Sequence, residues 1–493
     1  MSGAAPAEAP ASRLSRSLPF RRIAVVLSGG GALGAYEIGV LRVLEAIALV
    51  PSLVVGVSIG AINAVAWLAA GRDATKIENV WLTARGETLG VQWVSLALRI
   101  SGAFIALMGL LEMLLTLAGS GELSGAYWLW RHGNAAWDLL STQLDASFWL
   151  VLALIGALGV VYARQVARWL EQRRGDTDPE VARRRLSRVA LLAAVVHVFV
   201  WVMGWPWPHR FSAAVVILLA LAWAASTPGF LGRGLRSLAL GLMPETGGRG
   251  LWSGRARRRI LESLVASGDP RALSGTGTGL VVSALAVDRG LVTHFVSWPE
   301  VDADFERRIR DELGEVVHLR DAAETISAAV ASSAIPGVFQ PERVGGRDFV
   351  DAGGFTNQPL HVAIARGVDA VLVVLLSPSR PAELASTPDD VVALGSRLLE
   401  LANWRDLQTE LRHLPEGWSR EGAPARMCVV EPPSPLPTSP LQFDPARAAE
   451  LIELGKRDAW AALERAGWIE PARSAAAPAG GLSAPRPPDS LTG

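Results

Sequence analysis

Residues 54–66 read VVGVSIGAINAVA and place Ser58 between two glycines, where an apolar run gives way to an alanine-rich one. The apolar run is typical of a buried β-strand, and the sequence after the serine is typical of a helix that ends at Gly71. A Gly-x-Ser-x-Gly pentapeptide at such a junction forces a tight turn, in which Gly56 and Gly60 tolerate the close approach of backbone. The turn predicts either a nucleophile at a helix start, where partial positive charge favours an alkoxide, or simply a small residue in a tight bend.

The same order of elements occurs immediately upstream. Residues 21–28 (RRIAVVLS) form a short apolar run, and residues 29–34 (GGGALG) interrupt it with glycine. Residues 35–49 then carry apolar side chains at the spacing of a helix face. Strand, glycine turn, helix, strand, sharp turn and helix form the opening of a parallel α/β sheet. We therefore expect an α/β fold with a mostly parallel sheet sandwiched by helices.

The glycine run after the first strand has two interpretations. Its backbone N–H groups lie one crossover from Ser58 and suit the negative charge that develops on an attacked ester carbonyl. The candidate donors of this oxyanion hole are Gly29, Gly30, Gly31, Ala32 and Gly34. The same glycines fit the G-x-G-x-x-G dinucleotide fingerprint, which requires an acidic residue about 20 positions further on. Since no Asp or Glu occurs between Glu45 and Asp73, we expect no nucleotide.

A serine nucleophile needs a partner that accepts its proton. Asp351 ends a predicted strand in the stretch FVDAGG, and Ala352 and Gly353 continue this acid motif. Of the seven histidines, His361 alone offers a comparable position, and it supplies the rival arrangement, a Ser-His-Asp hydrolase. The ordinary pKa values of a carboxylate and a serine hydroxyl lie far apart. A Ser58–Asp351 dyad therefore requires desolvation and positive helix ends to narrow the difference.

The alternating pattern of strands and helices stops across residues 86–248. This insertion contains four apolar stretches of roughly the length that crosses a bilayer as a helix, at 100–118, 146–163, 189–208 and 211–232. Arginine is dense in residues 164–188 and after residue 232, but sparse in residues 119–145. We therefore expect a multi-pass protein of the inner (cytoplasmic) membrane, with four transmembrane helices and the α/β core on the cytoplasmic side. The alternatives are helices that lie in one leaflet and an apolar cap on the core, which Glu112 within the first stretch favours.

The remaining segments complete the expected domain organisation. Residues 1–20 predict a disordered leader and residues 471–493 a disordered tail, because both contain too little apolar sequence to be buried. The α/β core is expected in two parts, residues 21–85 and residues 249–380. Residues 381–470 are expected to add covering helices to that core.

Composition excludes several other classes of function. The chain carries 47 basic and 47 acidic side chains, so its net charge gives no reason to expect nucleic acid as a partner. Cys428 is the lone cysteine, which excludes an intrachain disulfide and a cysteine-based metal cluster. We expect neither a metal nor an organic cofactor, and nothing in the sequence predicts the oligomeric state.

Three motifs, in this order along the chain, resemble those of the patatin-like phospholipases. They are SGGGALGAY at residues 28–36, GVSIG at 56–60 and DAGG at 351–354, and SSAIPGVFQP at 332–341 resembles the Ser-x-x-x-Pro stretch of that family. The resemblance covers about residues 21–85 and 250–380. It implies a three-layer α/β fold, Ser58 as nucleophile, Asp351 as base and an oxyanion hole from the glycine loop. It also implies hydrolysis of acyl esters of lipids.

Two positions depart from the pattern of that family. Many relatives have Arg or Lys where Leu33 stands, so no side-chain charge assists the oxyanion here. Ala352 occupies a position that is usually glycine, which tests whether the position needs a positive φ. Together with the insertion, these departures motivate an alternative function, a catalytically inactive membrane scaffold or lipid-binding protein on the same fold.

Overall fold

The computed structural model describes residues 18–86, 93–117, 136–163, 165–166, 249–273, 277–312, 314–381, 383, 391–412, 414–418 and 424–470. Its contacts divide the chain into two compact units. The core unit comprises residues 1–85, 258–335 and 342–493, and the insertion unit comprises residues 86–257 and 336–341. The predicted tail at residues 471–493 and most of the predicted leader lie outside the described residues.

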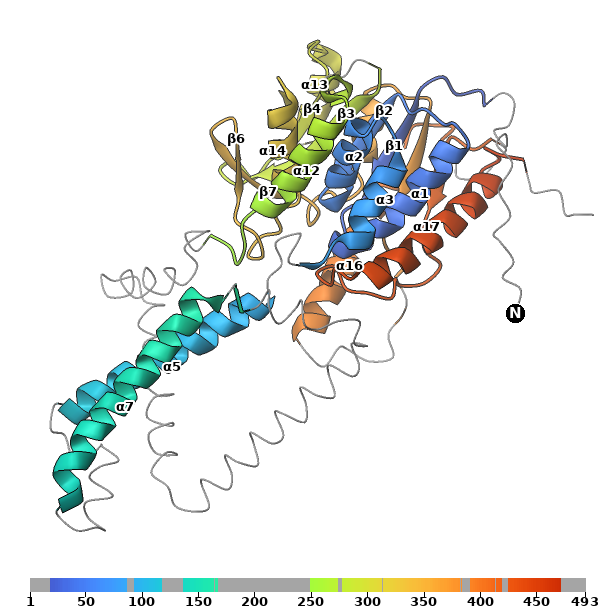
Figure 1. Ribbon diagram of the computed structural model, residues 1–493. Helices are drawn as coiled ribbons and strands as arrows, with labels where there is room; N and C mark the ends of the chain where they lie inside the picture. Colours follow the sequence, from blue (N-terminus) through green and yellow to red (C-terminus); the bar gives the residue numbers. More distant parts are fainter. Residues whose placement is uncertain are drawn as a thin grey trace, which may run out of the picture. The chain divides into compact units, whose positions relative to one another are not determined.

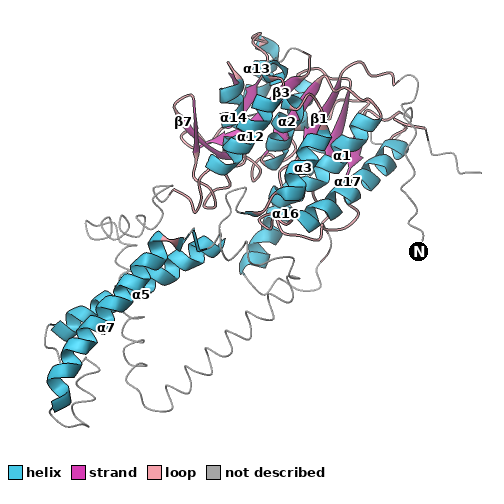
Figure 2. Cartoon of the chain, in the orientation of Figure 1, coloured by secondary structure: helices cyan, strands magenta, loops and turns pink. Residues whose placement is uncertain are grey.

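The core unit is built on one mixed sheet, which Figure 2 shows in magenta. Its strands are β1 (Ile23–Leu27), β2 (Leu53–Val57), β3 (Gly279–Ala286), β4 (Val292–Val296), β5 (Gly314–His318), β6 (Glu342–Val344), β7 (Arg347–Asp351), β8 (Ala370–Val374) and β9 (Met427–Val430). The order is β5-β4-β3-β2-β1-β8-β9, with β7 pairing with β3 and β6. The run from β3 to β9 is parallel throughout, whereas β4 and β7 are antiparallel to β3.

Helices cover both faces of this sheet (Figure 1). They are α1 (Ala35–Ala46), α2 (Ile59–Ala69), α3 (Ala74–Thr83), α12 (Arg255–Ser267), α13 (Ala303–Asp311), α14 (Ala322–Ser332), α15 (Leu360–Ala365), α16 (Val391–Arg412) and α17 (Pro445–Arg465). Two short 3-10 turns, η1 (Gly31–Gly34) and η2 (Pro270–Leu273), lie between β1 and α1 and between α12 and β3. The prediction of a mostly parallel sheet flanked by helices is confirmed.

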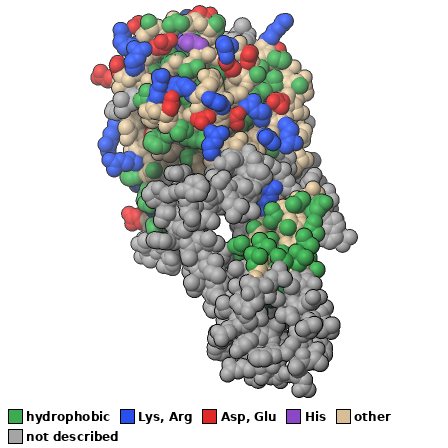
Figure 3. All heavy atoms as spheres, turned by 90° about the vertical axis from the view of Figure 1, so that its left-hand side faces the viewer, with side chains coloured by type: hydrophobic (Ala, Val, Ile, Leu, Met, Phe, Trp, Pro, Cys, Tyr) green, Lys and Arg blue, Asp and Glu red, His purple; other side chains and the backbone are tan. Residues whose placement is uncertain are grey.

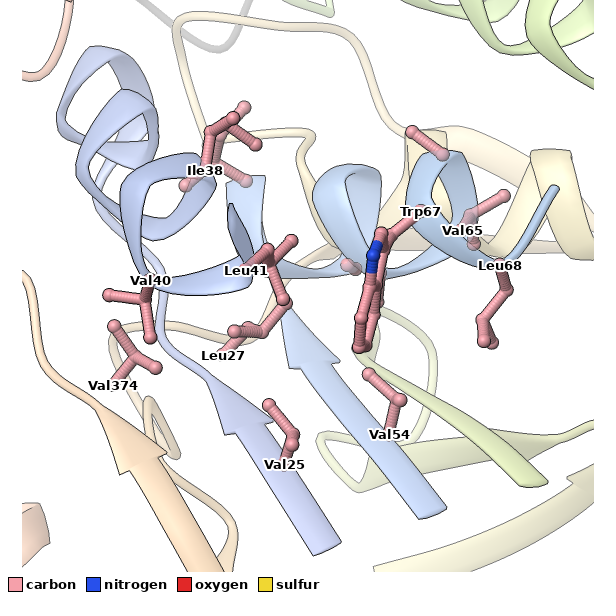
Figure 4. Packing of buried hydrophobic residues seen from close by; sticks show 14 of the residues in the cluster. Val25, Leu27, Ile38, Val40, Leu41, Val54, Val65, Trp67, Leu68 and Val374 are labelled. Atoms are coloured by element: carbon pink, nitrogen blue, oxygen red, sulfur yellow. The ribbon is translucent and has the colours of Figure 1, made fainter. Parts of the chain in front are cut away.

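The core strands are apolar on both faces because both faces are buried. In β1, Val25 and Leu27 belong to one hydrophobic cluster, whereas Ala24 and Val26 belong to a second cluster on the opposite face. Figure 4 shows the first cluster, in which Trp67 of α2 points toward the strands; its indole is almost completely buried. Truncation of a side chain of this size in a core typically costs about 3–5 kcal/mol. The apolar runs therefore fix both the strands and the helices that cover them.

Helices α1 and α17 touch at their backbones, which fixes the helix that follows the glycine loop. A Cβ atom built on Gly39 of α1 would lie 2.0 Å from the carbonyl oxygen of Ile452, and one built on Gly455 of α17 would lie 2.0 Å from that of Tyr36. Glycine is therefore required at both positions. This close packing holds α1, and with it the end of the glycine loop, against the rest of the core unit.

Strand β3 brings two distant strand ends together. Along the β3 edge that faces away from β4, residues 279–283 pair with β2 and residues 284–286 pair with β7. Strand β2 runs parallel to β3 and ends at Val57, opposite Ser283, while β7 runs antiparallel and ends at Asp351, opposite Ala284. The two strands thus lie one after the other along the same edge of β3, and their C-terminal ends meet. The residues at this junction become neighbours although they are far apart in sequence.

The insertion unit contains two long helices, α5 (Trp93–Leu117) and α7 (Ala136–Val161), which pack closely on each other. A Cβ atom on Gly102 would lie 2.7 Å from the carbonyl oxygen of Gly156, and one on Gly109 would lie 2.6 Å from the backbone nitrogen of Ala153. Small residues therefore form the contact between the helices. Many of the larger apolar side chains of α7 are exposed instead, namely Leu150, Val151, Leu154, Ile155, Leu158 and Val161. Figure 3 shows hydrophobic side chains gathered on the described part of this unit.

The prediction of membrane-spanning helices is not supported where the structure can be compared with it. Among the described residues, no helix combines the length and hydropathy that crossing a membrane requires. This finding applies to the predicted spans 100–118 in α5 and 146–163 in α7. The first of these spans also contains Glu112, and a carboxylate is costly within a bilayer. The other two predicted spans, 189–208 and 211–232, lie outside the described residues.

Candidate active site

Ser58 lies at the junction of β2 and α2 in a strained backbone conformation. Its φ is 54° and its ψ is −121°, and it is one of the few described non-glycine residues with a positive φ. The neighbouring glycines permit this turn, because a Cβ atom on Gly56 would lie 2.6 Å from the Cα of Ala61, and one on Gly60 would lie 2.3 Å from the Leu27 carbonyl oxygen. Such strain persists only where surrounding contacts impose it, and it is common at functional sites.

The end-to-end meeting of β2 and β7 places Ser58 against Asp351. The Ser58 Oγ donates a hydrogen bond to Oδ2 of Asp351, and both side chains are more than 90% buried, at 5% and 8% exposure. The other carboxylate oxygen, Oδ1, accepts the backbone N–H of Gly353 at 2.8 Å. Ser58 also precedes the first turn of α2, whose N-terminus favours negative charge. A hydroxyl, a carboxylate and a positive helix end therefore converge in one partly desolvated place.

Ser332, at the end of α14, supports the backbone of Ser58. Its hydroxyl oxygen accepts the backbone N–H of Ser58 at 2.8 Å and donates to the carbonyl oxygen of Ser283 at 2.6 Å. The side chain is completely buried. Ser332 begins the SSAIPGVFQP stretch, but the sequence analysis assigned it no role. In the folded structure the end of α14 lies beside β3, and Ser332 therefore connects the strained turn to the sheet.

The glycine loop lies beside Ser58, and several of its amides are already occupied. The N–H of Gly29 donates to Oδ1 of Asn357 at 2.8 Å, and the N–H of Ala32 donates to the carbonyl oxygen of Pro440 at 2.7 Å. Gly34 lies inside the 3-10 turn η1. Within the described part of the chain, the N–H groups of Gly30 and Gly31 have no hydrogen-bond partner. Of the five candidate oxyanion donors, these two amides are available.

A polar network holds the far end of the same loop. The Asn63 side chain donates to the carbonyl oxygen of Gly34 at 3.0 Å and to Oε2 of Glu37 at 2.8 Å, and it accepts the indole N–H of Trp81 at 3.1 Å. Glu37 is fully buried, and burial raises the pKa of its carboxyl well above the usual range, although Asn63 opposes this shift. Burial therefore favours the neutral form of Glu37, which acts as a structural group.

Helix α16 holds the chain that follows the acid motif. Oδ2 of Asp406 accepts the backbone N–H of Asn357 at 2.8 Å, and the Glu410 carboxylate accepts the backbone N–H of His361 at 2.8 Å. Burial raises the pKa of Asp406 to about 6, and Glu410 adds to this shift. Sequence reasoning missed Asn357, Asp406 and Glu410, because a single polar residue within a loop or helix carries no distinctive pattern.

His361 finds its partners away from Ser58. Its Nδ1 contacts Oε1 of Glu410 at 2.5 Å, and its ring packs edge-on against His294. Burial lowers the pKa of His361, but the hydrogen bond and charge of Glu410 outweigh it, so the net shift is upward. Burial, with the charge of His361, lowers the pKa of His294 well below its usual value. The rival Ser-His-Asp arrangement therefore has no geometric support at His361.

The two departures from the expected motifs are accommodated. Ala352 is buried and is absent from the described residues with positive φ, so alanine replaces glycine there without backbone strain. Its carbonyl oxygen accepts the backbone N–H groups of Phe355 and Thr356, which closes the turn. Leu33 packs against the hydrophobic core. In the described residues, no group of three or more His, Cys, Asp or Glu side chains has the arrangement of a metal site.

Comparison with known proteins gives one clear family assignment. The family model described as Patatin-like phospholipase matches residues 25–364. Among solved structures, the chain is similar to the crystal structure of VipD from Legionella pneumophila, with 13% sequence identity and a TM-score of 0.33. That similarity covers 91% of this chain and 67% of the VipD chain. No curated protein matches the chain.

Proposed function

Because the chain belongs to the patatin-like phospholipase family, we propose that it is a serine-dependent lipid acyl hydrolase in which Ser58 and Asp351 form the catalytic dyad. The observation that carries this proposal is the buried hydrogen bond from the Ser58 hydroxyl to the Asp351 carboxylate. The strained turn at Ser58 and the free amides of the neighbouring glycine loop support the same assignment.

In the first half of the reaction, Ser58 Oγ attacks the acyl carbonyl carbon of a lipid ester while its proton passes to Oδ2 of Asp351. Both side chains are more than 90% buried, which strengthens the hydrogen bond along which the proton moves, and the N-terminus of α2 favours the developing alkoxide. The tetrahedral intermediate then collapses, the ester C–O bond breaks, and the leaving alcohol takes the proton from Asp351. An acyl-serine remains.

In the second half, water attacks the acyl-serine while Asp351 accepts one of its protons. The second tetrahedral intermediate releases the fatty acid, and the proton returns to Ser58 Oγ. We assign the negative charge of both intermediates to the N–H groups of Gly30 and Gly31, the amides of the loop that are otherwise unpartnered. The dyad chemistry balances without a cofactor.

The insertion unit gives a reason to place this activity at a lipid surface. Leu150, Leu154 and Leu158 of α7 are each about half exposed, at 44–54%. Exposed apolar patches of this kind mark interaction sites, and a lipid substrate makes a bilayer the natural partner. We propose that these side chains enter the surface of the inner membrane and that the core unit works on its cytoplasmic side.

The dyad is tested by covalent labelling with a fluorophosphonate and by fatty-acid release from phosphatidylcholine vesicles. We expect the wild-type protein to be labelled, and the Ser58→Ala and Asp351→Asn variants to lose activity by at least ~10³-fold. A folded wild-type protein that is neither labelled nor active would overturn the hydrolase assignment and favour the inactive scaffold.

A matched variant separates the dyad from the rival triad. In His361→Asn, the side-chain nitrogen can still reach Glu410, so the buried contact between them is kept. We expect this variant to retain the wild-type rate of fatty-acid release. A loss as large as that of Asp351→Asn would instead assign the general base to His361.

A further inference from the structure

We propose that Asn357 is a positioning residue that locks the Gly29–Gly30 peptide in the orientation that keeps the Gly30 N–H free for the oxyanion. The inference rests on the proposed hydrolase function and names a device that the dyad depends on. The side-chain hydrogen bonds of Asn357 go to Gly29, so we assign it no direct part in proton transfer. Its effect passes through the backbone of the glycine loop.

The contacts between Asn357 and Gly29 are reciprocal. The N–H of Gly29 donates to Oδ1 of Asn357 at 2.8 Å, and Nδ2 of Asn357 donates to the Gly29 carbonyl oxygen at 3.3 Å. The Asn357 side chain is 4% exposed, so these bonds face little competition from water. Among the neutral side chains, an amide both accepts and donates at adjacent atoms, which is what this pairing requires.

The bond from Nδ2 of Asn357 to the Gly29 carbonyl oxygen also fixes the Gly30 N–H, because the peptide unit between them is planar. The carbonyl of Gly29 and the N–H of Gly30 belong to one rigid, trans peptide unit, so they point in opposite directions. Once Nδ2 of Asn357 holds the carbonyl on its own side, the Gly30 N–H must point away from Asn357. A flip of this unit would replace the donor with a carbonyl oxygen. Between two glycines such a flip meets little steric resistance, so an external lock is needed.

Asn357 lies close to both Gly29 and Ser58, and its own backbone is anchored by Asp406. A Cβ atom on Gly29 would lie 2.5 Å from Oδ1 of Asn357 and 2.9 Å from the Cβ of Ser58. The side chains of Asn357 and Ser58 therefore crowd the same side of the Gly29 Cα, where only glycine fits. Asn357 is anchored in turn, because its own N–H donates to Asp406 of α16. Asp406 thus fixes the backbone of the residue whose amide holds Gly29.

The test compares Asn357→Ala with a control that loses a buried hydrogen bond elsewhere. Thr278 donates to the Pro51 carbonyl oxygen at 2.8 Å, beside the start of β3 and away from the end of β2 that leads to Ser58. The Thr278→Val variant removes this bond and should lower the melting temperature without changing the rate per competent site. Competent sites are counted from the end point of fluorophosphonate labelling.

Two quantities separate a role in the oxyanion hole from a role in folding alone. For hydrolysis of p-nitrophenyl butyrate we expect Asn357→Ala to lower kcat per labelled site by ~10²-fold with KM changed by less than about threefold. We expect the inhibition constant of a trifluoromethyl ketone, whose serine adduct carries an oxyanion, to rise by a similar factor. A variant with wild-type kcat and inhibition constant per labelled site would overturn the inference.

A second variant covers the case in which Asn357→Ala does not fold. Asn357→Asp keeps the acceptor for the Gly29 N–H, loses the donor that orients the carbonyl and places a negative charge beside that carbonyl oxygen. Compared at the pH optimum of each protein, it should show the same weakening of ketone binding, and unchanged binding would overturn the inference. An active wild-type protein with an unaffected Asn357 variant rejects the lock alone, whereas an inactive wild-type protein rejects the hydrolase itself.

Discussion

At the scale of single residues, Ser58 holds a backbone conformation that an unconstrained serine would leave. A non-glycine residue in such a region costs on the order of 1–3 kcal/mol. The neighbouring glycines leave room for the turn, but room alone does not impose it. The Ser332 hydroxyl connects the Ser58 N–H to the Ser283 carbonyl and so ties the turn to β3. The strained turn at Ser58 and the hydroxyl that supports it therefore come from different parts of the sequence.

Removal of this support predicts a measurable loss. We expect Ser332→Ala to lower kcat by roughly 10-fold, the equivalent of one hydrogen bond of about 1.4 kcal/mol. The free energy of unfolding should also fall by about 1–3 kcal/mol, because the buried Ser58 N–H loses its partner. Ester hydrolysis and urea unfolding measure the two effects.

The adjacent serine provides the control. Ser333 is also buried, but its hydroxyl donates to the carbonyl oxygen of Val330 at the end of its own helix. Ser333→Ala should therefore leave kcat near the wild-type value. Equal losses in both variants would show that the end of α14, rather than the hydroxyl of Ser332, supports the turn.

At the scale of elements, α16 fixes the segment after the acid motif through Asp406, and this contact carries a pH dependence. The pKa of Asp406 is about 6 in the folded protein, above its ordinary value of 3.8. Between these values the folded state keeps a proton that the unfolded state has lost. Stability from this group is therefore fully present below pH 4 and is lost as the pH rises toward 6.

The Asp406→Asn variant should remove this dependence. We expect its stability relative to wild type to improve by about 2–3 kcal/mol between pH 4 and pH 6.5, as measured by urea unfolding at both values. If the difference in stability between the two proteins stays constant across this range, Asp406 does not titrate as its burial indicates.

The apolar face of α7 predicts binding to lipid. In the double variant Leu154→Glu/Leu158→Glu, two exposed leucines one helical turn apart become charged. We expect binding to neutral phosphatidylcholine vesicles, measured by co-sedimentation, to fall by at least about 10-fold, because each buried leucine contributes roughly 1.5–3 kcal/mol. Leu398 of α16 is 58% exposed in the core unit, so Leu398→Glu is the matched control. Unchanged binding of the double variant would count against a lipid-facing role for α7.

At the scale of the whole molecule, the site exists only when the sheet is complete. Ser58 and Asp351 are 293 positions apart, and the pairings of β3 with β2 and β7 bring them together. The site also includes the glycine loop, which follows β1, and Asn357, which lies in the segment that follows β7. No single segment of the sequence could therefore form the site alone.

This dependence predicts that the site and the sheet are lost together. As urea rises, fluorophosphonate labelling of Ser58 and protection of the β1, β2 and β3 amides from hydrogen exchange should share one midpoint, as in a cooperative domain. Labelling that disappears while these strands remain protected would show instead that the dyad junction opens locally.

Much of the core was predictable from the sequence because its signals are local. Apolar runs and glycine turns predicted β1, β2, the turn at Ser58 and the glycine loop, since strand burial and tight turns depend on neighbouring residues. The insertion was less predictable. Hydropathy alone favoured spanning helices at 100–118 and 146–163, which the described residues do not support. A pattern of apolar residues does not distinguish a span from helices that pack through glycine and expose leucine.

The sequence by itself determined the α/β fold class and the tight turn at Ser58, and it predicted Asp351 as the acid, because each of these depends on a short run of residues. Only the tertiary structure decided which amides of the glycine loop are free and which polar side chains support them. Asn357, Asp406 and Ser332 form hydrogen bonds with backbone groups that are far away in the sequence. No residue pattern around these side chains predicts those bonds. Their roles follow from the register of β2 and β7 beside β3, a property of the folded sheet rather than of any segment.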